Sequence, residues 1–183
     1  MAKFIFKKTK IKDLYLIEPQ LFGDHRGYFM ESYNEQAFKD AGLNYNFVQE
    51  NQSCSCRGVL RGLHFQKNHP QAKLVRVLHG EVFDVAVDLR HDSESYGQWV
   101  GAILSSENHM EMMIPRGFAH GFVVLSEKAE FSYLCDDFYH PEDEGGIIYD
   151  DPVLNIEWPQ TEERILSDKD KLLPGFEDAS IKF

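Results

Sequence analysis

The stretch AKLVRVLHGEVFDVAVDLR, residues 72–90, decides the fold class. In its second half the odd positions 83–89 are Phe, Val, Val and Leu, and the even positions 84–88 are Asp, Ala and Asp. Alternation with a period of two residues is typical of a β-strand with two different faces. The first half is another apolar run, and His79–Gly80 between the two halves predicts a tight hairpin turn.

Short runs of the same kind continue along most of the chain, at residues 47–55, 59–66, 98–105, 110–115, 117–126 and 129–139. Only two segments are predicted to be helical. Asn34 can cap a helix through about Ala41, closed by Gly42, and Ser167 with Asp170 resembles a capping box before a short C-terminal helix. Many strands with few helices favour an all-β sandwich or jelly-roll barrel, and we expect one domain over residues 1–183.

The composition restricts the classes of partner. A formal net charge of −11 argues against non-specific binding to nucleic acid and against an anionic membrane surface. No apolar run reaches the roughly 18 residues that a membrane span needs, and the first residues lack the apolar core of a secretory signal. The three cysteines form neither a disulfide framework nor a zinc-site spacing, so we expect reduced thiols in a cytoplasmic protein.

The stretch GVLRGLHFQ, residues 58–66, raises the question of function. It is either a strand with two stray polar residues or one wall of an active site. Strict alternation would place Arg61 and His64 on opposite faces, but a glycine inside a strand often marks a bulge. A bulge at Gly62 would let both side chains enter one cavity.

Other polar residues could join them. Tyr133 and Tyr139 are expected on one face of their strand, Gln49 and Asn51 share a face of theirs, and Lys73 begins its strand. A barrel interior with so many polar groups would be a costly core but a sensible pocket. Considered singly, each residue also has a structural explanation, such as packing for a strand tyrosine or a helix cap for Asp170.

A metal site has weaker support. His120 lies in IPRGFAHGF, which is similar to the second half of a cupin metal site. The first half of such a site normally contains two histidines at positions i and i+2 and a glutamate, and the region 74–85 has no such pair. We therefore predict no metal, and a hydrogen-bonding role for His120.

Several long motifs, in order, closely resemble the dTDP-4-dehydrorhamnose 3,5-epimerase family over residues 10–175. They are FGDHRGYFMESYN (22–34), VQENQSCSCRGVLRGLHFQ (48–66), KLVRVLHGEVFDVAVDLR (73–90), SYGQW (95–99), IPRGFAHGFVVLSE (114–127), EDEGGI (142–147) and IEWP (156–159). The resemblance implies a cupin-type jelly roll (a double-stranded β-helix), a homodimer with exchanged N-terminal strands, and no metal or organic cofactor. It also implies a dTDP-4-keto sugar substrate that is inverted at carbons 3 and 5.

The matching positions imply roles for particular residues. His64 would be the base, Asp170 its orienting carboxylate, Tyr133 the acid, and Lys73 the stabiliser of the enolate oxygen. Tyr139 would stack on thymine. The remaining expected substrate contacts are Arg26, Glu31, Gln49, Asn51, Arg61, His120, Glu144 and Lys169. The segment from Arg26 to Glu31 would reach the neighbouring subunit's site.

Three alternatives remain at this point. A relative could invert only carbon 3 or only carbon 5, and pocket shape rather than motif would decide this. A non-catalytic sugar-nucleotide-binding cupin would be favoured if His64 or Tyr133 were replaced, and neither is. A metal-dependent cupin isomerase or oxygenase is disfavoured by the missing histidine pair.

Overall fold

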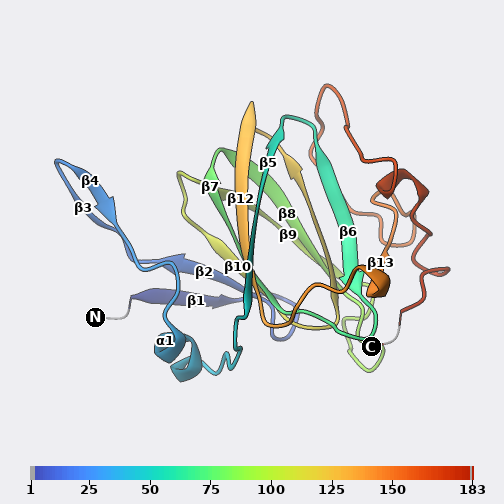
Figure 1. The fold of residues 1–183 in the computed structure, drawn as a ribbon, viewed down its shortest axis with the longest axis horizontal. Helices are drawn as coiled ribbons and strands as arrows, with labels where there is room; N and C mark the ends of the chain where they lie inside the picture. Colours follow the sequence, from blue (N-terminus) through green and yellow to red (C-terminus); the bar gives the residue numbers. More distant parts are fainter. Residues whose placement is uncertain (1–2, 182) are drawn as a thin grey trace.

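The chain folds into two antiparallel β-sheets that face each other, with a separate hairpin to one side (Figure 1). The computed structural model describes residues 3–181 and 183. The six-stranded sheet has the order β1 (Phe4–Lys8), β2 (Tyr15–Pro19), β10 (Glu111–Ile114), β7 (Lys73–His79), β12 (Lys128–Cys135) and β5 (Gln49–Cys56). The five-stranded sheet has the order β13 (Glu144–Gly146), β6 (Leu60–Gln66), β11 (Phe118–Val124), β8 (Glu81–Asp88) and β9 (Trp99–Ser105). Strands β3 (Phe22–Asp24) and β4 (Gly27–Phe29) form the hairpin.

The order of the strands is that of a jelly roll. From β5 to β8 and again from β9 to β13, each strand lies in the opposite sheet from the one before it. This alternation winds the chain around a common interior, as in a double-stranded β-helix. The predicted all-β, cupin-like fold is therefore confirmed.

The predicted hairpin at His79–Gly80 is wrong. Gly80 does make a tight turn, with φ +79°, but β7 pairs with β10 and β12 while β8 pairs with β9 and β11. The turn is a corner between the sheets, so Val77 and Val82 meet across the core. Because a glycine turn between two alternating runs is common to both arrangements, the local sequence could not distinguish them.

Three apolar layers hold the sheets. The inner layer, between the sheets, includes Val75, Phe122 and Phe131. A second covers the outer face of the five-stranded sheet with C-terminal residues such as Leu154 and Phe176. The third packs α1 (Glu35–Asp40) against the six-stranded sheet. Strand β8 is consequently buried on both faces, which explains why its aspartates at positions 84 and 88 are fully buried.

The two helical predictions are confirmed in part. The Asn34 side chain accepts a hydrogen bond from the Ala37 amide at 3.1 Å and caps α1. Near the C-terminus Ser167 Oγ accepts from the Asp170 amide at 3.1 Å, but only one 3₁₀ turn follows, η2 (Asp170–Leu172). A second such turn, η1 (Pro141–Asp143), and strand β13 were not predicted. For β1 to β4, the local pattern predicted no strand, and only the family resemblance implied N-terminal strands. Within residues 3–181 and 183, no helix has the length and apolar character to cross a membrane.

The predicted break in alternation lies at Gly62. Arg61 pairs with Phe122 and His64 pairs with His120, so Gly62 and Leu63 together oppose the single residue Gly121. Two residues against one define a β-bulge. Because directly paired residues share a face of the sheet, Arg61 and His64 both face the interior together with their partners on β11.

Replacing Gly62 should destabilise the protein strongly. Its φ is +113°, and an added Cβ would lie 2.6 Å from both Gly121 Cα and the His120 carbonyl oxygen. We expect Gly62→Ala to lower the free energy of unfolding by about 2 kcal/mol or more, measured by thermal and urea denaturation. Gly23→Ala is the matched control, because its added Cβ would meet no atom closer than 3.8 Å. Equal stability of the two variants would contradict this account of the bulge.

Candidate active site

A cavity of about 450 Å³ opens between the two sheets. Strands β5, β6, β7, β11 and β12 and the C-terminal segment 165–170 line it, and Phe122 and Phe131 contribute apolar surface. A second hollow of about 270 Å³ adjoins it on the side of Gln49 and Tyr139. The side chains common to both hollows are those of His64, Lys73 and Tyr133. These three residues therefore lie where the hollows meet.

His64 and Asp170 form a hydrogen-bonded pair. The distance from His64 Nε2 to Asp170 Oδ1 is 2.6 Å, and the carboxylate is almost fully buried. Burial favours the neutral acid, but hydrogen bonds from His64 and Ser167 outweigh it and lower the pKa of Asp170. Ser167 caps the turn through the Asp170 amide, and the Asp170 carboxylate bonds to the histidine.

Lys73 and Tyr133 come from the opposite sheet. Lys73 Nζ lies 5.8 Å from the centroid of the Tyr133 ring. Burial raises the pKa of Tyr133, so the phenol stays protonated and can donate a hydrogen bond. Burial also lowers the pKa of Lys73, against the opposing effect of Cys135 and Asp84. Both groups thus lie in a less polar medium than water.

His120 lines the same cavity and pairs with a second aspartate, Asp84, which was not among the predicted site residues. His120 Nε2 is 2.9 Å from Asp84 Oδ2, and both side chains are buried. Asp84 Oδ1 has no hydrogen-bond partner among the described residues. In the sequence, Asp84 is one of the polar positions of an alternating strand. The available signal was an acidic residue within a mostly apolar strand, because a carboxylate buried there needs a polar partner.

The second hollow gathers several of the predicted contact residues. Gln49 Nε2 donates to Asn51 Oδ1 at 3.0 Å, and Gln49 Oε1 accepts from the Tyr139 amide at 3.0 Å. Arg61 lies instead in the larger cavity, where its Nε donates to Ser55 Oγ at 3.1 Å. Lys169 also lines the larger cavity.

Glu144 links the two hollows. Its Oε2 accepts hydrogen bonds from the Tyr139 hydroxyl at 2.7 Å and from Lys169 Nζ at 2.5 Å. Burial opposes ionisation of Glu144, but these two bonds outweigh it and lower its pKa. The same bond to Glu144 raises the pKa of Tyr139 to about 12. The carboxylate therefore orients a lysine and a tyrosine at the border of the two hollows.

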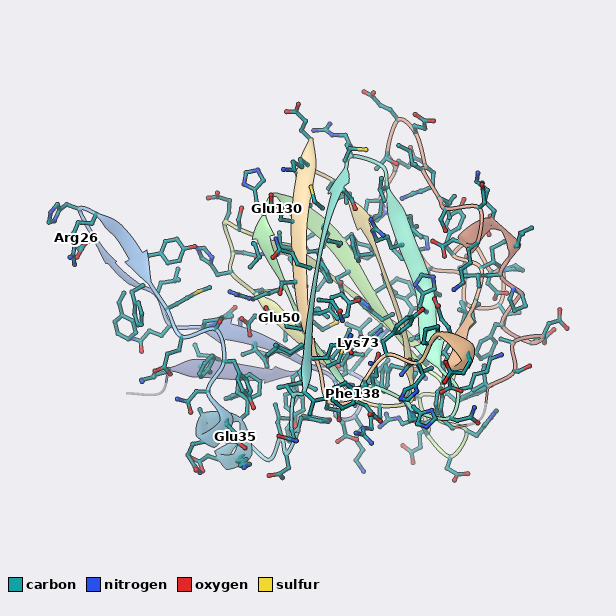
Figure 2. All side chains as sticks on the ribbon, in the orientation of Figure 1. Arg26, Glu35, Glu50, Lys73, Glu130 and Phe138 are labelled. Atoms are coloured by element: carbon teal, nitrogen blue, oxygen red, sulfur yellow. The ribbon has the colours of Figure 1, made fainter. Side chains whose placement is uncertain are left out.

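Arg26 and Glu31 do not reach the cavity of their own chain. Arg26 lies at the tip of the β3–β4 hairpin, far from Lys73 in the body of the molecule (Figure 2). Its guanidinium pairs with Asp24, and Glu31 pairs with Lys3 and Asn34. The structure thus separates these two residues from the rest of the predicted site.

Metal ions in proteins are held by clusters of histidine, cysteine, aspartate and glutamate side chains. In the part of the chain that the structure describes, no three or more of them are arranged to hold a metal ion. His120, the residue similar to a cupin ligand, has Asp84 as its partner.

Comparison with known proteins agrees with this geometry. The family model for dTDP-4-dehydrorhamnose 3,5-epimerase matches residues 8–178. The Pseudomonas aeruginosa enzyme of that name is 57% identical over 173 residues, which cover 94% of this chain and 96% of the relative. A crystal structure of the Elizabethkingia anophelis enzyme is 55% identical, with a TM-score of 0.92 over 96% of this chain and 98% of that one.

A third relative was solved with a ligand. It is the dTDP-6-deoxy-D-glucose-3,5-epimerase of Legionella pneumophila in complex with dTDP-4-keto-L-rhamnose. It is 51% identical, with a TM-score of 0.92 over 94% of this chain and 92% of that one. Sequence, fold and the paired histidine and carboxylate in the cavity thus lead to one conclusion: the chain belongs to the dTDP-4-dehydrorhamnose 3,5-epimerase family of isomerases.

Proposed function

We propose that this chain converts dTDP-4-dehydro-6-deoxy-D-glucose into dTDP-4-dehydro-L-rhamnose for dTDP-L-rhamnose synthesis, with His64 as base and Tyr133 as acid. The keto group at carbon 4 acidifies the hydrogens at carbons 3 and 5. His64 removes such a proton, and the enolate that forms is protonated from the opposite side of the ring by Tyr133. Asp170 holds the imidazole in position and stabilises its protonated form.

One observation above all supports this assignment: the base and the acid come from opposite sheets. His64 lies on β6 of the five-stranded sheet, and Tyr133 lies on β12 of the six-stranded sheet. Both line the hollows between the sheets. A sugar held between them has one group on each face. Inversion requires this, because a single group would tend to return the proton to the face from which it came.

Lys73 is the group that stabilises the enolate. It lies on the same sheet as Tyr133, beside its ring. A positively charged amine in a partly dry cavity stabilises a developing oxyanion more strongly than it would in water. His120, held by Asp84, and Arg61 would contact the sugar and phosphate region.

The nucleotide would occupy the second hollow and the rim. Tyr139 would stack on thymine, and Gln49 and Asn51 would bind nearby polar atoms. Arg61 and Lys169 bring positive charge to a protein with a net charge of −11, and a pyrophosphate needs such local charge.

We further propose a homodimer in which N-terminal strands are exchanged and the hairpin of one copy completes the site of the other. Arg26 and Glu31 would then contact the nucleotide bound by the partner. The hairpin is exposed and carries large apolar side chains, including Tyr28 and Phe29, at 58% and 67% exposure. Exposed aromatic residues of this kind are typical of surfaces that another chain covers. Three free thiols support a cytoplasmic location.

Isotope exchange tests the reaction. Turnover of dTDP-4-dehydro-6-deoxyglucose in deuterated water should place deuterium at both carbon 3 and carbon 5, because each inverted centre takes its new proton from an exchangeable group. Mass spectrometry and NMR of the product locate the label. Label at only one carbon would instead identify a single-carbon epimerase.

Removal of the base should stop exchange without preventing binding. We expect His64→Ala to lose at least about a thousandfold in kcat, since general-base catalysis contributes up to about 10⁴-fold and the imidazole that Asp170 holds is then missing. Asp170→Asn should lose less, because the imidazole remains. Binding of dTDP, measured by calorimetry, is the control. Retained exchange in His64→Ala would assign the base to another residue.

A mixing experiment tests the shared site. Arg26→Ala and His64→Ala should each be inactive alone, because every site lacks one residue. Random pairing of refolded subunits makes about half of the dimers mixed, and each mixed dimer has one intact site, so about a quarter of wild-type activity should return. No recovery, with mixed dimers shown by native mass spectrometry, would mean that Arg26 serves its own chain or none.

A further inference from the structure

The loop 136–144 holds Tyr139 and Glu144, and apolar burial does not fix it. Phe138 and Tyr139 are 59% and 50% exposed, and Figure 2 shows Phe138 at the lower edge of the molecule. Loops with so little buried apolar surface are usually mobile. Another interaction must therefore hold the tyrosine at the rim of the hollow.

Asp143, the last residue of η1, supplies such an interaction. Its side chain is 3% exposed and accepts hydrogen bonds from the backbone amides of Asn68 at 2.8 Å and His69 at 2.7 Å. The Asn68 amide group and His69 Nδ1 also bond to this carboxylate. Burial opposes ionisation, but these bonds outweigh it and lower the pKa of Asp143 to about 2. One carboxylate thus ties the loop to residues 68 and 69.

Gln66 makes a second tie between the same two segments. Its Oε1 accepts from the His140 amide at 2.6 Å, and its Nε2 donates to the carbonyl oxygens of His69 at 2.7 Å and Phe138 at 3.2 Å. The rings of His69 and His140 stack with centroids 4.1 Å apart. Gln66 thus holds the backbone on both sides of Tyr139, and Asp143 holds the loop three residues further on.

We propose that Asp143 is a positioning residue for the nucleotide, which fixes Tyr139 and Glu144 in place before the substrate binds. The proposal rests on the proposed stacking of Tyr139 on the thymine base of the nucleotide. Asp143 itself bonds to residues 68 and 69, away from the two catalytic pairs. It acts on affinity because a loop that is already ordered loses less conformational entropy on binding. It leaves the proton-transfer steps at His64 and Tyr133 unchanged.

The test compares Asp143→Asn with Glu142→Gln. Both remove one carboxylate from η1, but the Glu142 side chain is 74% exposed and its carboxylate pairs with His140 Nδ1 at 3.4 Å. We expect Asp143→Asn to weaken dTDP binding in calorimetry and to raise KM about tenfold, with kcat within about twofold. Glu142→Gln should match the wild type. Gln66→Met, which removes the second tie, should act in the same direction and decides the matter if Asp143→Asn does not fold.

A double-mutant cycle separates positioning from general stability. If Asp143 acts through Tyr139, Asp143→Asn should cost little further dTDP affinity, about twofold or less, once Tyr139→Ala is present. Full additivity of the two losses, or wild-type affinity in a folded Asp143→Asn, overturns the proposal. Wild-type dTDP affinity in Tyr139→Ala overturns the contact of Tyr139 with thymine, and with it the action of Asp143 through Tyr139. Deuterium exchange by the unmodified chain tests the proposed reaction independently.

Discussion

The close approach of β6 and β11 is the constraint on which the site depends. Two glycines face each other there: a Cβ on Gly62 would lie 2.6 Å from Gly121 Cα, and a Cβ on Gly121 would lie 2.7 Å from the Arg61 carbonyl oxygen. Because neither strand has a side chain at this point, β6 can fit an extra residue against β11. Without that bulge, the alternation of the strand would turn Arg61 away from the cavity that His64 lines.

The two facing sheets then divide the chemistry between them. The five-stranded sheet provides His64 and His120, each held by a carboxylate, and the six-stranded sheet provides Lys73 and Tyr133. The two sets of side chains also differ in their electrostatic surroundings. The histidines pair with aspartates from neighbouring segments, whereas the lysine and the phenol lie in a drier medium with shifted pKa values. In the proposed mechanism, a proton donor and a proton acceptor can thus lie on either side of the sugar ring without neutralising each other.

Much of the fold could be predicted from local patterns, and the failures have a common cause. Alternating runs identified the strands from β5 to β12, and Asn34 identified α1. The turn at His79–Gly80 was read as a hairpin because its residues fit both a hairpin and a corner between sheets. The short strands β3, β4 and β13 have three residues each, too few to show a period. Pairing partners are long-range contacts, and no local pattern contains them.

The sequence by itself determined the types of chemical group and the strands that hold them, since residue type and periodicity are local properties. It placed His64, Lys73, Tyr133 and Asp170 in one site only through resemblance to a family. The tertiary structure decided that Asp170, 106 residues from His64, lies 2.6 Å from it, and that Asp84 lies beside His120. It also placed the carboxylate of Asp143, within the loop that holds Tyr139, against the backbone amides of residues 68 and 69. These arrangements depend on which strands face each other, and packing of the whole chain sets that.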